Sequence, residues 1–128
     1  LINDIKTVKY SFNPYNVGRL GIAAGCAAMK DREYFDACRS KIIATRGRVA
    51  YELAKLGFTV LPSKANFLLI RHVGVGGEEM YRALKQRGVL VRHLKDERIK
   101  DFVRVTIGTD DEMDVFLKKT AEILGELK

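Results

Sequence analysis

The chain has 128 residues, 47% of them hydrophobic, and its 23 Lys and Arg against 16 Asp and Glu give a net charge of +7. That length suits one domain with its own core, or part of a larger protein. No apolar run approaches the roughly 18 residues of a transmembrane helix, and no secretory signal pattern stands at the N-terminus. Basic residues are interleaved with acidic ones along the chain, which disfavours a nucleic-acid-binding surface and indicates a solvated surface. A positive field would also favour a small anionic substrate.

The first part of the chain predicts two helices. Residues 1–13 lead into Asn13-Pro14, a pair typical of a helix start because proline fits the first turn. A helix rich in Gly and Ala is expected from about Tyr15 to Lys30, and its small side chains would let a neighbour approach closely. Asp31 is then the expected N-cap of a longer helix that Gly57 ends.

Beyond Gly57 the apolar pattern shortens to strand length. We expect an α/β fold with a small, largely antiparallel sheet and packed helices, preceded by the two long helices. Thr109 and Glu112 have the spacing of a capping box at the start of the last helix. The predicted elements here are strands at 58–61, 66–70, 89–92 and 101–108, and helices from about Glu78 to Arg87 and from Thr109 onward. The predicted organisation is an N-terminal segment with an interface helix at 1–30, a connecting helix at 31–57 and an α/β subdomain at 58–128.

Arg104 is the most informative single residue. It interrupts the apolar run Phe102-Val103-Arg104-Val105-Thr106-Ile107, and alternation places Phe102, Arg104 and Thr106 on one face of that strand. A buried guanidinium without a partner costs several kcal/mol. An anionic ligand, an internal ion pair and a water-exposed edge strand are all open explanations.

Arg92 ends the preceding predicted strand, so pairing of the two strands would bring both guanidinium groups to one edge of the sheet. Two such forks suit a phosphate or a carboxylate, because each donates two parallel hydrogen bonds. Alternatively, Arg92 lies near a loop and points into solvent.

Other residues give weaker signals. His72 and His93 have no acidic or thiol partner at catalytic spacing, and the glycines of 74–77 lack the spacing of a phosphate-binding loop. Asn66 opens an apolar strand, where a buried amide would bind backbone or ligand. Cys26 and Cys38 lie in helical apolar stretches without metal-site spacing, so we expect buried, reduced thiols, no metal site and a cytoplasmic protein.

Four motifs occur in a definite order: Asn13-Pro14-Tyr15-Asn16-Val17, Pro62-Ser63-Lys64-Ala65-Asn66-Phe67, Arg87-Gly88-Val89-Leu90-Val91-Arg92 and the run 102–109. Together they resemble the C-terminal part of the histidinol-phosphate aminotransferases, within the fold-type-I, pyridoxal-phosphate-dependent class I/II aminotransferases. The resemblance extends from about residue 3 to 124. It implies the small C-terminal domain of such an enzyme.

The resemblance also implies a reaction and residue roles. The family transfers an amino group between L-histidinol phosphate and 2-oxoglutarate in histidine biosynthesis, as a homodimer. Arg104 matches the arginine that grips the anionic group of the substrate, and Arg92 a second phosphate-contacting arginine. Tyr15 and Asn16 match a loop near the subunit interface and the active site.

The family's Schiff-base lysine and cofactor-binding residues lie upstream of the matched region. Lys64 belongs to a C-terminal motif and is not the aldimine lysine. We therefore expect no catalytic residue, no bound cofactor and no transamination in this chain alone, and the start at Leu1 indicates a processed product or an excised piece. Exposed apolar helix faces would favour self-association. The alternatives are another class I/II aminotransferase or decarboxylase, acting on aromatic amino acids or threonine phosphate, and a non-catalytic anion-binding module.

Overall fold

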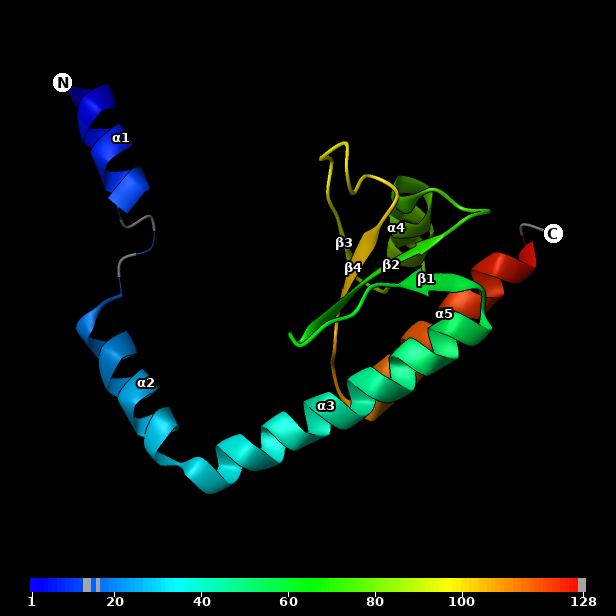
Figure 1. The fold of residues 1–128 in the computed structure, drawn as a ribbon, viewed down its shortest axis with the longest axis horizontal. Coiled ribbons are helices and arrows are strands. Elements are labelled where there is room, and N and C mark those ends of the chain that lie inside the picture. The colour runs from blue at the N-terminus through cyan, green and yellow to red at the C-terminus, as the bar shows by residue number, and fades with distance from the viewer. Residues whose placement is uncertain (13–14, 16, 127–128) are drawn as a thin grey trace. The chain divides into compact units, whose positions relative to one another are not determined.

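The computed structural model describes residues 1–12, 15 and 17–126, which form five helices and one four-stranded antiparallel sheet (Figure 1). The predicted α/β class is confirmed. The chain divides into two units, Leu1–Ala37 and a larger one that begins at Cys38. The helix start predicted at Asn13-Pro14 lies outside the described residues. Within the described ranges, no helix combines the length and the apolar character needed to cross a membrane.

The first unit contains two short helices, α1 (Ile2–Phe12) and α2 (Arg19–Lys30). The sequence patterns assigned no helix to the region of α1, although Asp4 in its first turn and Lys9 in its last turn both suit the helix dipole. Helix α2 starts later than predicted and buries none of its residues. Cys26 lies on α2 and is exposed, so the expected burial of this thiol is wrong.

Helix α3 (Arg32–Lys55) begins and ends as its sequence predicts. The backbone N–H of Tyr34 donates to Asp31 Oδ1 at 3.2 Å, which makes Asp31 the N-cap. At the other end, Gly57 has a φ of 87°, a left-handed conformation that glycine adopts without strain. This turn directs the chain from α3 into the sheet.

The sheet belongs to the second unit and has the strand order β1-β2-β4-β3. Its strands are β1 (Phe58–Val60), β2 (Phe67–His72), β3 (Arg92–His93) and β4 (Val103–Thr106), and all neighbours are antiparallel. In register, Leu68 pairs with Val105 and Ile70 with Val103. These four side chains are buried on one face, so the other face of the sheet can carry polar residues.

The helices of the second unit supply the rest of the core on that buried face. Besides the second half of α3, they are α4 (Gly77–Gln86) and α5 (Asp110–Glu126). Their buried residues include Val49 and Leu53 from α3, Met80 and Leu84 from α4, and Met113, Phe116 and Ile123 from α5. The core is therefore one layer of helices against one face of the sheet, the arrangement that a small amphipathic sheet requires.

Helices α3 and α5 run side by side (Figure 1) and are joined by a polar cluster. The hydroxyl of Thr45, a buried residue, donates to Asp110 Oδ1 at 3.0 Å. Arg48 forms ion pairs with Asp110 at 2.9 Å and with Asp114 at 2.5 Å. The hydrogen bonds from Arg48 and, next, from Thr45 hold the pKa of Asp110 below its ordinary value.

One predicted strand is largely wrong. Of the predicted strand 89–92, only Arg92 joins the sheet, where it pairs with Arg104. The reason is that the N–H of Val89 donates to the carbonyl of Leu84 at 2.9 Å, and Gly88 turns there with a φ of 78°. These bonds close the end of α4, so the segment caps a helix before it reaches the sheet.

The last helix starts as predicted. The backbone N–H of Thr109 donates to Glu112 Oε2 at 2.8 Å, and the N–H of Glu112 donates back to Thr109 Oγ1 at 3.3 Å. This reciprocal pair is a capping box. It fixes α5 directly after the strand that carries Arg104.

Candidate anion-binding site

The face of the sheet opposite the helices, called the open face below, carries the candidate site. It is defined by Thr59, Phe67, Leu69, Arg71, Arg92, Phe102, Arg104 and Thr106, whose positions alternate with those of the buried residues. These side chains are exposed or half-buried. None of them is acidic, whereas three are arginines, so the face is positively charged.

Arg104 lies at the centre of the open face. In β4 it pairs with Leu69 of β2 on one side and with Arg92 of β3 on the other. Its guanidinium carbon lies 5.1 Å from the centre of the Phe67 ring, close enough for a cation–π interaction. Its Nε atom is buried and has no hydrogen-bond partner. A buried donor without an acceptor costs about 1–3 kcal/mol, which an anion at this position would offset.

Arg92 stands directly opposite Arg104. Like charges in directly opposed positions destabilise a sheet, so this pairing needs a compensating negative charge. Neither arginine forms an ion pair with any carboxylate among the described residues. Of the three explanations left open by the sequence, the internal ion pair is thus not observed within that part of the chain.

Three arginines on the helices of the second unit differ from this pair because they form ion pairs. Arg48 pairs with Asp110 and Asp114, Arg82 pairs with Glu78 at 2.7 Å, and Arg87 pairs with Glu126 at 2.5 Å. Acidic residues are therefore available to this fold and are used on its helices. Their absence from the open face distinguishes Arg92 and Arg104 from ordinary surface arginines.

The other predicted site residues are Tyr15, Asn16 and Asn66. Tyr15 is 84% exposed, and Asn16 lies outside the described residues. Asn66 is exposed, so the buried amide expected there is not observed. Its backbone carbonyl accepts a hydrogen bond from the N–H of Ile107 at 2.9 Å, which helps to align β2 with β4.

The Ser63-Lys64 pair does not form a binding site for the cofactor phosphate. Ser63 Oγ donates to the carbonyl of Phe67 at 2.6 Å and accepts from the N–H of Ala65 at 3.1 Å. Lys64 is exposed in the same turn. The hydroxyl is thus committed to the turn that starts β2, and these residues do not fit a role in holding a cofactor phosphate or forming a Schiff base.

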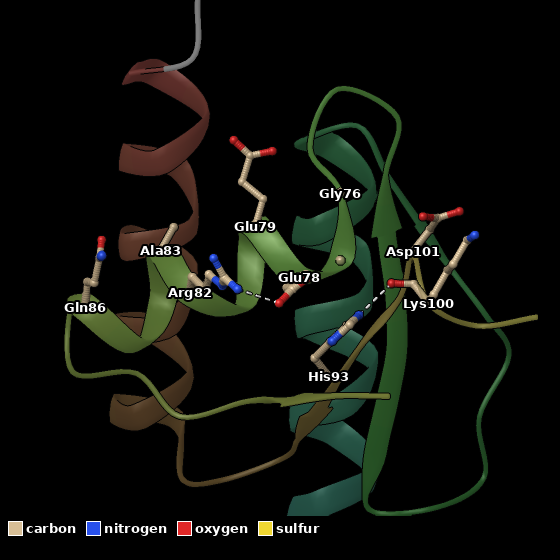
Figure 2. Close-up of a pocket in the computed structure, with 10 residues that line it drawn as sticks. Gly76, Glu78, Glu79, Arg82, Ala83, Gln86, His93, Lys100 and Asp101 are labelled. Atoms are coloured by element: carbon tan, nitrogen blue, oxygen red, sulfur yellow. Dashed lines mark hydrogen bonds and ion pairs between the residues drawn. The ribbon is translucent and has the colours of Figure 1, made fainter. Parts of the chain in front are cut away.

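A separate hollow lies between the start of α4 and the loop before β4 (Figure 2). Its charged side chains are largely satisfied: Arg82 pairs with Glu78, and His93 Nε2 donates to the carbonyl of Lys100 at 2.7 Å. His72 likewise accepts a hydrogen bond from the N–H of Gly74 at 3.1 Å through Nδ1. Both histidines therefore form hydrogen bonds with backbone groups.

Two residues of the open face, Arg71 and Phe67, were not singled out in the sequence. The guanidinium carbon of Arg71 lies 5.4 Å from the centre of the Phe102 ring, and the Phe67 ring lies against Arg104. Strand alternation alone could have placed Arg71 on the same face as Leu69. The pairing of β2 with β4 brings Arg71 close to Arg104, and the sequence of β2 alone does not predict that pairing.

Comparison with known proteins assigns this fold to a family. The model of the aminotransferases of class I and II matches residues 5–119. The chain belongs to this family. Pyridoxal phosphate is the cofactor of these aminotransferases, which are transferases.

Among its relatives, the histidinol-phosphate aminotransferase of Brachyspira hyodysenteriae is 47% identical over 124 residues, which are 97% of this chain and 35% of the relative. The solved structure of the histidinol-phosphate aminotransferase from Clostridium acetobutylicum aligns with a TM-score of 0.78 at 27% identity, over 93% of this chain and 37% of the other. The structure of the histidinol-phosphate aminotransferase from Sinorhizobium meliloti in complex with pyridoxal-5'-phosphate aligns with a TM-score of 0.75 at 24% identity. The alignment covers 93% of this chain and 34% of the other. The chain spans about a third of the length of the relatives it matches.

Proposed function

We propose that this chain is the C-terminal part of a pyridoxal-phosphate-dependent histidinol-phosphate aminotransferase and that it supplies the anion-binding arginines of the active site. The observation that carries the proposal is the Arg92–Arg104 pair, two opposed guanidinium groups on a face without acidic residues. The names of the relatives support the substrate assignment. The parent reaction is amino transfer between L-histidinol phosphate and 2-oxoglutarate.

In this proposal, the two arginines bind and orient the substrate. A phosphate opposite Arg104 and Arg92 would accept parallel hydrogen bonds from both guanidinium groups, and a carboxylate would take the same place in the other half-reaction. The Phe67 ring below Arg104 limits the positions that the guanidinium can take. Such fixed donors hold a substrate in register with the reacting group, which is the part of the work left to the protein.

Pyridoxal phosphate would supply the electron sink for breaking and making the bond to the amino group. The Ser63 hydroxyl is bonded within its own turn and Lys64 is exposed, so this pair does not fit a site for it. We propose that residues of the parent protein outside this chain hold the cofactor, that the chain alone is inactive and that the parent is a cytoplasmic homodimer. Tyr15 and Asn16 would lie near the subunit interface of that dimer.

The test is an assay of the intact parent protein with its cofactor. We expect glutamate formation from L-histidinol phosphate and 2-oxoglutarate, with much lower activity on threonine phosphate and aromatic amino acids. Preference for one of those substrates would assign the chain to another class I/II enzyme. Phosphate binding without any amino transfer would favour a non-catalytic anion-binding module.

A further inference from the structure

We propose that Arg71, held above Phe102, is a third anion-binding side chain of the open face and that it makes this face prefer small ligands with two anionic groups. The proposal extends the anion site of the proposed function and rests on it. Arg71 on β2 lies diagonally from Arg104, which pairs directly with Arg92, so the three arginines share the open face, and none of the residues that define this face is acidic.

The register places Arg71 close to Arg104. Leu69 pairs with Arg104, and Arg71 is two residues further along β2 on the same face. Arg71 and Arg104 are therefore diagonal neighbours, which lie about 7–8 Å apart in antiparallel pairs. Two long guanidinium side chains at that separation can contact charged groups that are a few bonds apart in one small molecule.

The aromatic rings give both arginines a defined support. The guanidinium carbon of Arg71 lies 5.4 Å from the centre of the Phe102 ring, and that of Arg104 lies 5.1 Å from the centre of the Phe67 ring. A ring under a guanidinium leaves its N–H groups free at the edges for an acceptor. Arg71 is exposed and forms no ion pair with a described carboxylate, so its donors are available to a ligand.

Charge complementarity indicates the ligand class. One monoanion bound between Arg104 and Arg92 would leave the charge of Arg71 uncompensated beside it. A second anionic group on the same molecule would neutralise the charge of Arg71 without the entropic cost of binding a second molecule. Dicarboxylates such as glutarate, and 2-oxoglutarate in the proposed reaction, have this form.

The experiment compares glutarate with valerate, which has five carbons but one carboxylate, using the full 128-residue chain. Dissociation constants come from NMR titrations of arginine Nε–H signals, with inorganic phosphate as a third probe. We expect the unmodified chain to prefer glutarate over valerate at least fivefold. Arg71→Gln should weaken glutarate binding at least fivefold and change valerate and phosphate binding less than twofold.

Arg82→Gln is the matched control, because it removes the same charge from an exposed arginine of α4 that is paired with Glu78. It should change all three constants less than twofold. Arg71→Lys keeps the charge without the planar fork, and an intermediate loss of glutarate affinity is expected. Unfolding midpoints of all variants show whether each remains folded.

The outcomes separate this inference from the proposed function. Equal effects of Arg71→Gln and Arg82→Gln on glutarate, or no preference for glutarate over valerate, would overturn the role of Arg71. Loss of phosphate binding in Arg104→Gln would then still support the principal anion site. Phosphate binding that is unchanged in Arg104→Gln would contradict that site itself.

Discussion

The position of Arg104 explains why an arginine is tolerated in an apolar strand. Its neighbours Val103 and Val105 are 1% and 2% exposed and face the core, whereas Arg104 points to the open face with Phe67 beneath it. Alternation therefore keeps the charge out of the core. What the fold does not supply, among the described residues, is a hydrogen-bond acceptor for its Nε atom.

Arg104→Lys in the intact parent enzyme tests that role. Lysine keeps the charge but loses the bidentate fork, and a hydrogen bond to a charged group contributes about 1.5–3 kcal/mol. We expect kcat/KM for L-histidinol phosphate to fall about ten- to a hundredfold. Arg82→Lys, on α4, is the control and should leave the kinetics unchanged. Unaltered kinetics in Arg104→Lys would refute the assignment.

At the level of helices and strands, backbone contacts decide how the site is framed. Gly77 begins α4, and a Cβ added there would lie 2.5 Å from the carbonyl oxygen of Lys100 and 2.8 Å from the carbonyl carbon of Asp101. The start of α4 thus packs directly on the loop that leads into β4. A side chain larger than hydrogen would push apart the helix and the strand that carries Arg104.

Gly77→Ala is therefore expected to destabilise the chain, by about 1–3 kcal/mol as in other overpacked sites. Gly76→Ala is a closely matched control, because a Cβ at the neighbouring position meets nothing within 4 Å and its φ of −63° suits any residue. Urea unfolding of the two variants measures the difference. Equal free energies of unfolding would contradict the close contact.

The contact between α3 and α5 at Asp110 should make the free energy of unfolding depend on pH in the acidic range. Arg48 and Thr45 hold the pKa of Asp110 low in the folded chain, so this contribution is present above the ordinary aspartate pKa of about 3.9 and is lost as the pH falls through the folded value. Asp110→Asn should unfold more readily at pH 7 and show a shallower loss of stability between pH 5 and pH 2. Thermal melts across that range check this, and an unchanged slope would speak against it.

For the whole molecule, the exposed apolar side chains of α2 are the notable feature. Leu20 is 87% exposed and Met29 57% exposed, and no residue of α2 is buried. Exposed apolar surface of this kind commonly binds a partner. Under the proposed function, that partner would be the remainder of the parent protein or its second subunit.

We expect the isolated chain to self-associate through α2. Leu20→Glu should lower the mass measured by light scattering at high concentration. Val73→Glu is the control: it adds the same charge at a residue that is 93% exposed in the second unit, and it should leave the mass unchanged. A monomer at all concentrations in the unmodified chain would contradict the expectation.

Local signals in the sequence predicted much of this fold. Asp31, Gly57 and the Thr109–Glu112 capping box mark helix ends through bonds within a few residues, and each was read correctly. The strand at 89–91 was wrong because Val89 bonds back to α4. The opposition of Arg92 and Arg104 was inferred from their order, whereas the place of Arg71 depends on the β2–β4 register. The predicted burial of Asn66 and Cys26 was wrong because apolar neighbours in the sequence do not determine which parts of the fold cover a residue.

Arg104 and Arg92 are proposed to bind one anion together. The direct measurement is an NMR titration of the 128-residue chain with inorganic phosphate, following the Nε–H signals of its arginines. We predict saturable shifts of the Arg104 and Arg92 signals, both lost in Arg104→Gln, while the paired Arg48 and Arg87 stay unchanged. Shifts spread evenly over all arginines, or absent from Arg104, would contradict an anion site at this pair.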